Sequence, residues 1–418
     1  MRKALCSFLF LFSVALSVAG APADGTPIQS LDASYDAERR EIAGTFVTSL
    51  PAEGAPEAAA ENTVYFLLLP NLDRERNPHF SAREIDSRYP YGFEESALDI
   101  DAVLLVDGDA RRPAAYRLLS VAPGLQTYSL SDAALAVDVQ TASAVEIRFT
   151  TRAPRVSTGD GGVTGETFTW RFGWFPLLIQ SVPGLREQGA TLFAGDSDAF
   201  PLVFPRTEIE ARISVPEDVV LTAGADEIER VDAAEDDDET ATYALRNASP
   251  TRSLALSFAA DLERYRLDGP TPIEVTFRKG HEDEARLLST YARDILADYA
   301  SRFGAYPRPI LRIVEGASTD GDAMSADGIA ILSSRFFTHR DILVPGVLHR
   351  LTEFVLAHEI AHQWFGMLGG IDLDRDGWLS EGLSQYASVG YFERRYGAAD
   401  PNLLFVTGNG VHEDAVAK

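Results

Sequence analysis

The spacing of apolar residues changes near residue 268, and this change limits the possible folds more than any other feature. From residue 28 to about 265, short runs alternate apolar and polar residues, as half-buried β-strands do. From about residue 282, apolar residues recur at steps of three and four, as on an amphipathic helix. Strands that come first, followed by helices, are typical of the α+β class.

Residues 28–268 are expected to form one large antiparallel β-sheet, sandwich or saddle domain. Turn signals such as Pro123-Gly124 and a loop rich in Ala, Glu, Pro and Gly at 51–62 separate its strands. The alternating pattern predicts strands at Thr63–Leu69, Ala102–Val106, Ala144–Thr151, Glu166–Phe172, Ile209–Val215 and Thr251–Phe258.

Residues 269–418 are expected to form a second domain that mixes helices and strands. The apolar pattern predicts strands at 273–277, 310–315 and 329–332, and helices at 282–303, 347–367 and 380–396.

Two histidines at helical spacing indicate a metal site in this second domain. His358 and His362 are four positions apart, so both imidazoles project from one helix face and can share a cation. Glu381, with eighteen residues between it and His362, is the candidate third ligand. Three protein ligands leave one position open for water, the layout of a catalytic zinc site with one Zn²⁺ per chain. The alternative is that two histidines share a packed helix by chance.

Glu359 is the candidate general base. It points about 100° around the helix from His358, so it is poorly placed to ligate the same ion. Beside the metal, it can take a proton from the attacking water and pass it to the leaving amine. The alternative role is an ordinary surface carboxylate.

The metal-binding segments resemble a known family. His358-Glu359-Ile-Ala-His362-Gln-Trp-Phe-Gly followed by Trp378-Leu-Ser-Glu381-Gly is similar to the zinc signature of the membrane alanyl aminopeptidases, gluzincin metallopeptidases that include aminopeptidase N and leukotriene hydrolase. The resemblance extends weakly from residue 28 and strongly from about 290. It implies an N-terminal β domain, a thermolysin-like zinc catalytic domain and a peptide substrate.

Two features depart from the family pattern. Family aminopeptidases carry Gly-x-Met-Glu-Asn upstream of the zinc helix, and its glutamate binds the substrate's free amine. This chain has Ala323-Met324-Ser325-Ala-Asp327 there, so Ser325 replaces that glutamate, and Asp322 or Asp327 is the candidate substitute. We take Ala323, Met324, Ser325 and Asp327 as candidate substrate contacts.

The second departure concerns the tyrosine that stabilises the oxyanion in the family. Tyr386, Tyr391 and Tyr396 do not match its position, and 37 residues follow Glu381. We therefore expect a catalytic domain that is incomplete at its C-terminus, or an oxyanion stabiliser from elsewhere.

The N-terminus predicts export. Arg2 and Lys3, an apolar run from Ala4 to Val18 and a small-residue site ending at Ala21 form a secretory signal over residues 1–21. A membrane anchor is the competing interpretation, but the run is about fifteen residues and a span needs about twenty. We expect a periplasmic or extracellular protein without a stable membrane span after signal removal.

The composition limits which residues can bind a metal and which macromolecules the protein can bind. The single cysteine, Cys6, would leave with the signal, so only His, Asp and Glu remain as metal ligands. A formal charge of −26 repels nucleic acid, so no nucleic-acid partner is expected.

The acidic run at 234–239 is expected to be a solvated loop, with a cation site as the alternative. Asp372, Asp374 and Asp376 start like a calcium loop, but Leu383 stands where its glutamate is required. One of these aspartates is a candidate to orient a ligand histidine.

Taken together, the sequence predicts an exported zinc metallopeptidase, with an aminopeptidase of the aminopeptidase N type as the leading hypothesis. The alternatives are a zinc endopeptidase or other zinc hydrolase, and a metal-binding interaction module without turnover. The oligomeric state and the side-chain preference stay open.

Overall fold

The structure is a computed structural model of the chain. It describes residues 26–50, 62–76, 92–122, 130–155, 161–179, 185–194, 204–231, 240–247, 249–317, 323–338, 347–371 and 376–397, together with residues 82, 85 and 89. Several predictions therefore lie outside the described residues: the signal at 1–21 with Cys6, Pro123-Gly124, the acidic run at 234–239, Asp372 and Asp374, and most of the loop at 51–62.

The first part of the chain is built from three sheets. The largest has eight strands in the order β16-β17-β14-β1-β2-β8-β4-β5. Its strands are β1 (Ile28–Asp36), β2 (Glu41–Ser49), β4 (Ala97–Asp107), β5 (Ala110–Pro113), β8 (Ala144–Arg152), β14 (Glu208–Pro216), β16 (Glu227–Val231) and β17 (Thr240–Arg246).

A six-stranded sheet and a four-stranded sheet complete this part. In sheet order, the six strands are β11 (Leu177–Leu178), β3 (Thr63–Leu67), β7 (Leu130–Asp138), β6 (Tyr116–Ala122), β13 (Thr191–Ala194) and β12 (Leu185–Gln188). The four strands are β15 (Val220–Ala223), β18 (Leu256–Ala259), β10 (Thr167–Trp170) and β9 (Gly161–Thr164). A short 3-10 helix, η1 (Leu69–Asp73), follows β3.

Most strand pairs in this part are antiparallel, as expected, but two are parallel. β1 pairs with β14, and β6 pairs with β13, in parallel register. The expectation of a purely antiparallel domain is therefore wrong in these two places. Parallel neighbours need a long connection between them, and the chain between β1 and β14 contains most of the other strands.

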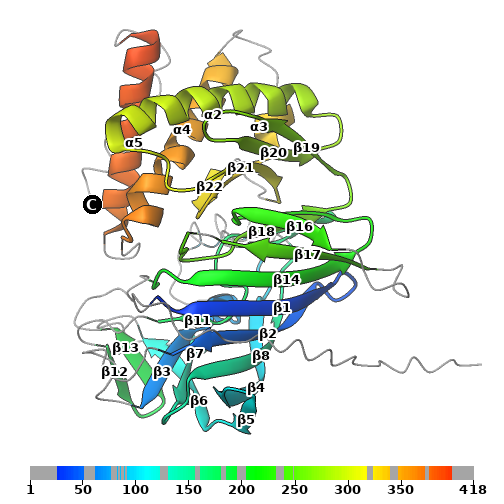
Figure 1. The fold of residues 1–418 in the computed structure, drawn as a ribbon, viewed down its shortest axis with the longest axis vertical. Coiled ribbons are helices and arrows are strands. Elements are labelled where there is room, and N and C mark those ends of the chain that lie inside the picture. The colour runs from blue at the N-terminus through cyan, green and yellow to red at the C-terminus, as the bar shows by residue number, and fades with distance from the viewer. Residues whose placement is uncertain are drawn as a thin grey trace, which may run out of the picture.

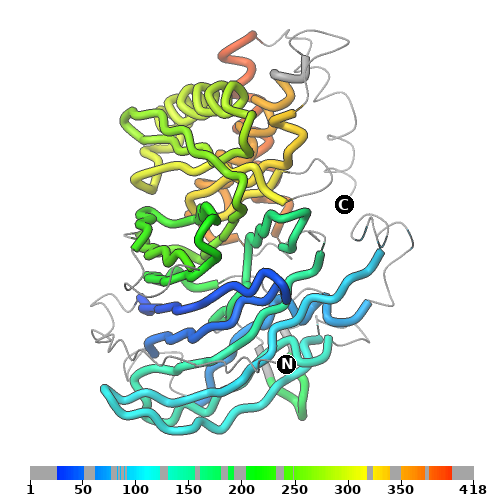
Figure 2. Tube along the Cα trace, turned by 90° about the vertical axis from the view of Figure 1, so that its right-hand side faces the viewer, coloured from blue at the N-terminus to red at the C-terminus, as the bar shows by residue number. Residues whose placement is uncertain are grey.

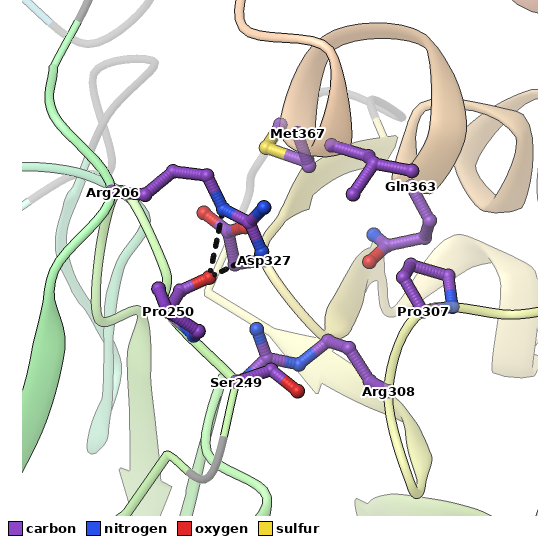
Figure 3. A pocket seen from close by; sticks show the side chains of 9 residues that line it. Arg206, Ser249, Pro250, Pro307, Arg308, Asp327, Gln363 and Met367 are labelled. Carbon is purple, nitrogen blue, oxygen red and sulfur yellow. Dashed lines mark hydrogen bonds between the residues drawn. The ribbon is translucent and has the colours of Figure 1, made fainter. Parts of the chain in front are cut away.

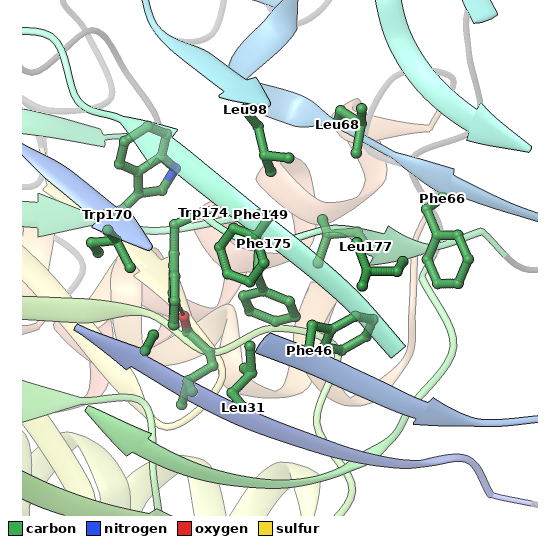
Figure 4. Packing of buried hydrophobic residues seen from close by; sticks show 14 of the residues in the cluster. Leu31, Phe46, Phe66, Leu68, Leu98, Phe149, Trp170, Trp174, Phe175 and Leu177 are labelled. Carbon is green, nitrogen blue, oxygen red and sulfur yellow. Dashed lines mark hydrogen bonds between the residues drawn. The ribbon is translucent and has the colours of Figure 1, made fainter. Parts of the chain in front are cut away.

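One apolar core holds the β-rich part together. Alternate residues of β1 and β14 face it, as the period of two requires. Figure 4 shows aromatic side chains gathered at its centre, where the Trp174 and Phe175 rings meet edge to face with centroids 5.0 Å apart. The Trp174 indole nitrogen donates to the Leu254 carbonyl at 2.7 Å, so its one polar atom is satisfied.

The second part contains a five-stranded sheet in the order β19-β20-β21-β23-β22. Its strands are β19 (Leu262–Leu267), β20 (Ile273–Arg278), β21 (Leu311–Gly316), β22 (Ala323–Ala326) and β23 (Ile329–Ser333). The edge strand β22 runs antiparallel to β23, whereas β20, β21 and β23 are mutually parallel. The sheet starts at Leu262, ahead of the domain boundary expected at 268, and that boundary stays a prediction.

Helices cover one face of this sheet. They are α2 (Glu282–Phe303), α3 (Arg335–Thr338), α4 (Val347–Ala361) and α5 (Gly377–Tyr396), and a π-helical turn, η2 (Gln363–Leu368), follows α4. Figures 1 and 2 show the five-stranded sheet between these helices and the β-rich part. Apolar side chains of the sheet and helices form a second core.

Helix α2 illustrates why local sequence sets local structure here. It spans the predicted residues 282–303, and its apolar residues at steps of three and four are buried, from Ala285 through Leu288 to Tyr299. Acidic residues occupy its first turn, which complements the positive end of the helix dipole. Gly304, with φ of +94°, follows the last turn.

Elsewhere, the observed ends of strands and helices differ from the predicted ends by a few residues. The strand expected at Thr251–Phe258 forms only from Leu256, and the helix expected at 347–367 changes to π-helical geometry after Ala361. Among the described residues, no helix is both long enough and apolar enough to cross a lipid bilayer.

Candidate metal centre

The candidate ligands lie where α4 and α5 pack against each other. His358 comes from the last turn of α4, His362 lies between α4 and η2, and Glu381 comes from the beginning of α5. The two helices are held by contacts such as that of Phe354 with Phe392, whose ring centroids are 5.1 Å apart. The apolar faces predicted from the sequence thus bring the three polar ligands together.

The ligand atoms converge on one point. His358 Nε2 and His362 Nε2 are 3.1 Å apart, and Glu381 Oε2 lies 3.0 Å from His358 Nε2. The other Glu381 oxygen, Oε1, is 3.5 Å from His362 Nε2. Among the described residues, this trio is the group of His, Cys, Asp and Glu side chains whose ligand atoms all lie within 4.8 Å of one another.

These separations fit a single zinc ion. Two nitrogens on one tetrahedral zinc at about 2.0–2.1 Å lie about 3.3 Å from each other. The observed N–N and N–O separations of 3.0–3.5 Å bracket that value. Two imidazole nitrogens and one carboxylate are also a common donor set of catalytic zinc, which keeps a fourth position for water.

The turn after α4 fixes the orientation of the His362 ring. His362 Nδ1 lies 3.2 Å from the Phe365 carbonyl oxygen and 3.1 Å from the hydroxyl oxygens of both Ser380 and Ser384, so Nδ1 has acceptors for its proton and Nε2 is left to face the other ligands. Ser380 Oγ donates to the same carbonyl at 2.8 Å. Gly366 in this turn has a φ of +132°, which a residue with a side chain rarely adopts.

The sequence analysis did not predict the role of the Phe365 carbonyl, because every residue has a main-chain carbonyl and a sequence motif therefore does not single one out. The sequence suggested an aspartate as the orienting group, and of the three candidates only Asp376 is described. It precedes α5 and its side chain makes no capping hydrogen bond.

The surroundings of the site shift the pKa values of the two histidines in opposite directions. Burial lowers the pKa of His358, but the hydrogen bond to Glu381 and the neighbouring carboxylates outweigh it, so this pKa is raised. Burial dominates at His362 and lowers its pKa, helped by the charge of His358. The hydrogen bond from His358 lowers the pKa of Glu381 despite its burial. Glu381 is therefore an anion ready to bind a cation.

Glu359 sits beside the ligands but faces another partner. Its side chain is buried, and Ser325 on β22 lies against it. Ser325 Oγ is 2.7 Å from both Glu359 Oε2 and the Glu359 carbonyl oxygen. The edge strand thus holds the candidate base next to the ligand cluster.

Sequence comparison identifies the part of the chain that carries this site. Residues 290–417 match the model of the Peptidase family M1 domain. Residues 290–417 are therefore similar to this domain, and we call them the M1 segment. Over 95 residues the chain is 30% identical to Aminopeptidase Q of Acinonyx jubatus and to that of Felis catus. The matched segment is 22% of this chain and only 10% of either relative.

Structural comparison extends the likeness beyond the M1 segment, as fold alone. A mutant M1 zinc metallopeptidase of Deinococcus radiodurans, bound to a Tyr-Ser-Ala substrate, superposes with a TM-score of 0.56 and 14% identity. That match covers 92% of this chain and 74% of the other. The same enzyme without the mutation gives a TM-score of 0.52 at 15% identity, covering 88% and 70%.

The predicted substrate contacts of the M1 segment divide into two pairs. Ala323 and Met324 on β22 are only partly buried. Ser325 and Asp327 are buried, and each already has protein partners. Asp327 accepts hydrogen bonds from the Arg252 backbone nitrogen at 3.1 Å and from Ser253 Oγ at 3.4 Å. Asp322 lies outside the described residues.

The three tyrosines on the ligand helix of the M1 segment serve other purposes. Tyr391 and Tyr396 donate hydrogen bonds to Glu353, a buried residue of α4. The Tyr386 side chain is exposed.

Proposed function

We propose that this protein is a zinc-dependent peptidase that hydrolyses peptide bonds with water. The observation that carries the proposal is the convergence of His358, His362 and Glu381 at zinc-compatible separations, with Glu359 buried beside them. The M1 segment supports the same reaction class.

Each side chain then has a defined task. A bound zinc would polarise the scissile carbonyl and lower the pKa of a water molecule. Glu359 accepts the proton of the attacking water and delivers it to the leaving amine. Ser325 holds one oxygen of that carboxylate, and the Phe365 carbonyl keeps Nε2 of His362 turned toward the ion.

An aminopeptidase of the aminopeptidase N type is the leading hypothesis for specificity, supported by the distant likeness to Aminopeptidase Q. One observation favours the alternative of an endopeptidase or another zinc hydrolase. Ser325 stands where the family has its amine-binding glutamate, and the candidate substitute Asp327 is buried against Arg252 and Ser253.

A peptide panel tests the proposal and separates these specificities. Zinc-loaded protein is assayed on matched peptides with a free or an acetylated N-terminus, before and after removal of zinc with a chelator. We expect zinc-dependent cleavage, which Glu359→Gln reduces by about 100-fold or more while zinc content stays the same. A preference for the free amine supports the aminopeptidase, and cleavage within the acetylated peptides supports the endopeptidase.

Two outcomes of this panel oppose the proposal. Stoichiometric zinc without turnover of any peptide favours the metal-binding interaction module. A protein that folds but binds no zinc removes the basis of both the hydrolase and the module.

Export to the periplasm or the medium is also proposed, on the composition of residues 1–21. N-terminal sequencing of the mature protein tests it, and cleavage after Ala21 is expected. A mature chain that begins at Met1 opposes it.

A further inference from the structure

One arginine of the β-rich part contacts the turn that follows the metal-binding helix. Arg252 lies just before β18, and its Nε donates to the Met367 carbonyl of η2 at 3.2 Å. Its Nη1 donates to the Phe204 carbonyl within its own part of the molecule. The guanidinium therefore ties the two parts together at the end of the zinc helix.

The same junction is packed closely enough that glycine is required. Gly370 has a φ of +62°, and a Cβ there would overlap the Arg252 guanidinium. On the other side, a Cβ at Gly224 would overlap the backbone oxygen of Asp327. These close approaches explain why glycine stands at both positions: one brings the Arg252 side chain onto the chain after η2, and the other brings the β22–β23 hairpin onto the β-rich part.

Side chains of both parts also line one pocket at this junction. Figure 3 shows Arg206 and Pro250 of the β-rich part facing Gln363 and Met367 of η2, with Asp327 between them. Gln363 accepts from the Gly328 backbone nitrogen and donates to the Ala326 carbonyl, each at 2.9 Å. The turn that begins next to His362 is thus clamped to the β22–β23 hairpin as well.

The path from Arg252 to the metal is short. The Met367 backbone nitrogen donates to the His362 carbonyl at 3.1 Å, which closes the π-helical turn. Inside that turn, the Phe365 carbonyl accepts from His362 Nδ1 at 3.2 Å. A turn anchored at Met367 by Arg252 therefore holds one of the groups that orient a metal ligand, the other two being the Ser380 and Ser384 hydroxyls of α5.

We propose that Arg252 is a positioning residue of the metal centre, through which the β-rich part holds the His362 imidazole in its metal-binding orientation. This inference rests on the metal site of the proposed function. Replacing groups that orient a metal ligand typically weakens metal affinity about 10- to 100-fold. Because Arg252 acts through the turn, an effect of about tenfold is expected.

Arg252→Met in the full chain tests the inference, since methionine keeps much of the apolar stem but cannot donate. Arg206→Met is the matched control, because Arg206 lines the same pocket but donates its hydrogen bonds to the Pro250 carbonyl, within its own part of the molecule. Zinc affinity is measured by competition with a chromophoric chelator, and the ligand geometry by the visible absorption of the cobalt-substituted protein.

We expect Arg252→Met to weaken zinc binding about tenfold and to change the cobalt spectrum, while Arg206→Met leaves both unchanged. Arg252→Lys, which keeps the charge and a donor, should recover part of the affinity. Equal zinc affinity and equal spectra for wild type and Arg252→Met overturn the inference but leave the proposed function intact. A wild type that binds no zinc overturns both.

A second variant tests the same contact in another way. Gly370→Ala leaves the arginine in the chain but crowds its guanidinium, and it also strains the backbone because Gly370 has a φ of +62°. Circular dichroism first establishes that this variant is folded without metal. Unchanged zinc binding in Gly370→Ala opposes the inference, and weaker binding supports it when Arg252→Met adds no further loss in the Gly370→Ala background.

Discussion

At the scale of single residues, the site is defined by which atom of each side chain is already engaged. The Phe365 carbonyl engages Nδ1 of His362, so Nε2 is the atom that remains for a metal. Ser325 engages Glu359 Oε2, which leaves Oε1 of the same carboxylate for a water molecule. The hydrogen bonds made by each side chain thus separate a ligand from a base.

Ser325→Ala is expected to lower kcat about tenfold without changing zinc content. The change removes a hydrogen bond to a charged group, and such bonds contribute about 1.5–3 kcal/mol. The Glu359 carboxylate then adopts other orientations, and fewer of them reach the attacking water. Steady-state kinetics with a cleaved peptide and metal analysis of the same sample measure the two quantities.

Ser333→Ala is the matched control for this prediction. Ser333 is also a buried serine, on the neighbouring strand β23, and its hydroxyl has no hydrogen-bond partner in the described structure. Ser325→Thr keeps the hydroxyl and should retain more of kcat than alanine does. If alanine and threonine at 325 give the same kcat as wild type, Ser325 does not position Glu359.

At the scale of elements, a buried carboxylate connects the two helices that carry the ligands. Glu353 on α4 accepts hydrogen bonds from Tyr391 and Tyr396 on α5, and its Oε1 is 3.0 Å from Arg395 Nε. A buried charge is tolerated only when it is paired and hydrogen-bonded, and all of these partners come from α5. The packing of α4 on α5 therefore depends on this group as well as on apolar contacts.

Glu353→Gln is expected to lower the free energy of unfolding by about 2 kcal/mol, the size of a lost hydrogen bond to a charged group. The amide carries no charge for Arg395, and its NH₂ group faces hydroxyl donors. Denaturant titration of the metal-free protein measures the difference. Glu393→Gln on the exposed face of α5 is the control, and equal losses in the two variants would contradict a specific role for the buried carboxylate.

At the scale of the whole molecule, the sequence predicted what short-range patterns encode. The helix at 282–303 and the metal-binding helices follow from periodicity and spacing, because both are local. The parallel pairing of β1 with β14 was missed, since nothing within β1 specifies a partner that far along the chain. The contact of Arg252 with Met367 was missed for the same reason.

The candidate substrate contacts show a different limit. Asp327 was proposed because it is a carboxylate near a motif position, but sequence does not show whether a carboxylate is accessible. In the fold it is enclosed by Arg252 and Ser253 of the β-rich part, far from it in sequence. Burial at the junction of two parts is a property of the tertiary structure.

That burial makes the stability of the molecule depend on pH in a specific direction. Burial raises the pKa of Asp327 above its ordinary value of 3.8, although Arg308 and hydrogen bonds partly offset it. The unfolded chain therefore loses this proton at a lower pH than the folded chain does. The stabilisation from protonated Asp327 is fully present below about pH 3.8 and is lost as pH rises through the raised folded pKa.

Asp327→Asn removes this titration, so the stability of wild type relative to the variant should fall as pH rises from about 4 to 8. Urea denaturation of the metal-free proteins at several pH values measures the difference, and omitting zinc removes the pH dependence of metal binding. Asp268→Asn is the control, because the Asp268 side chain is 87% exposed. A difference that stays constant across this range would mean that the pKa of Asp327 is not raised in the folded protein, and one that grows in favour of wild type with pH would mean that the fold holds Asp327 as a stabilised anion. Attraction between the Asp327 carboxylate and the neighbouring arginines would then stabilise the junction of the two parts.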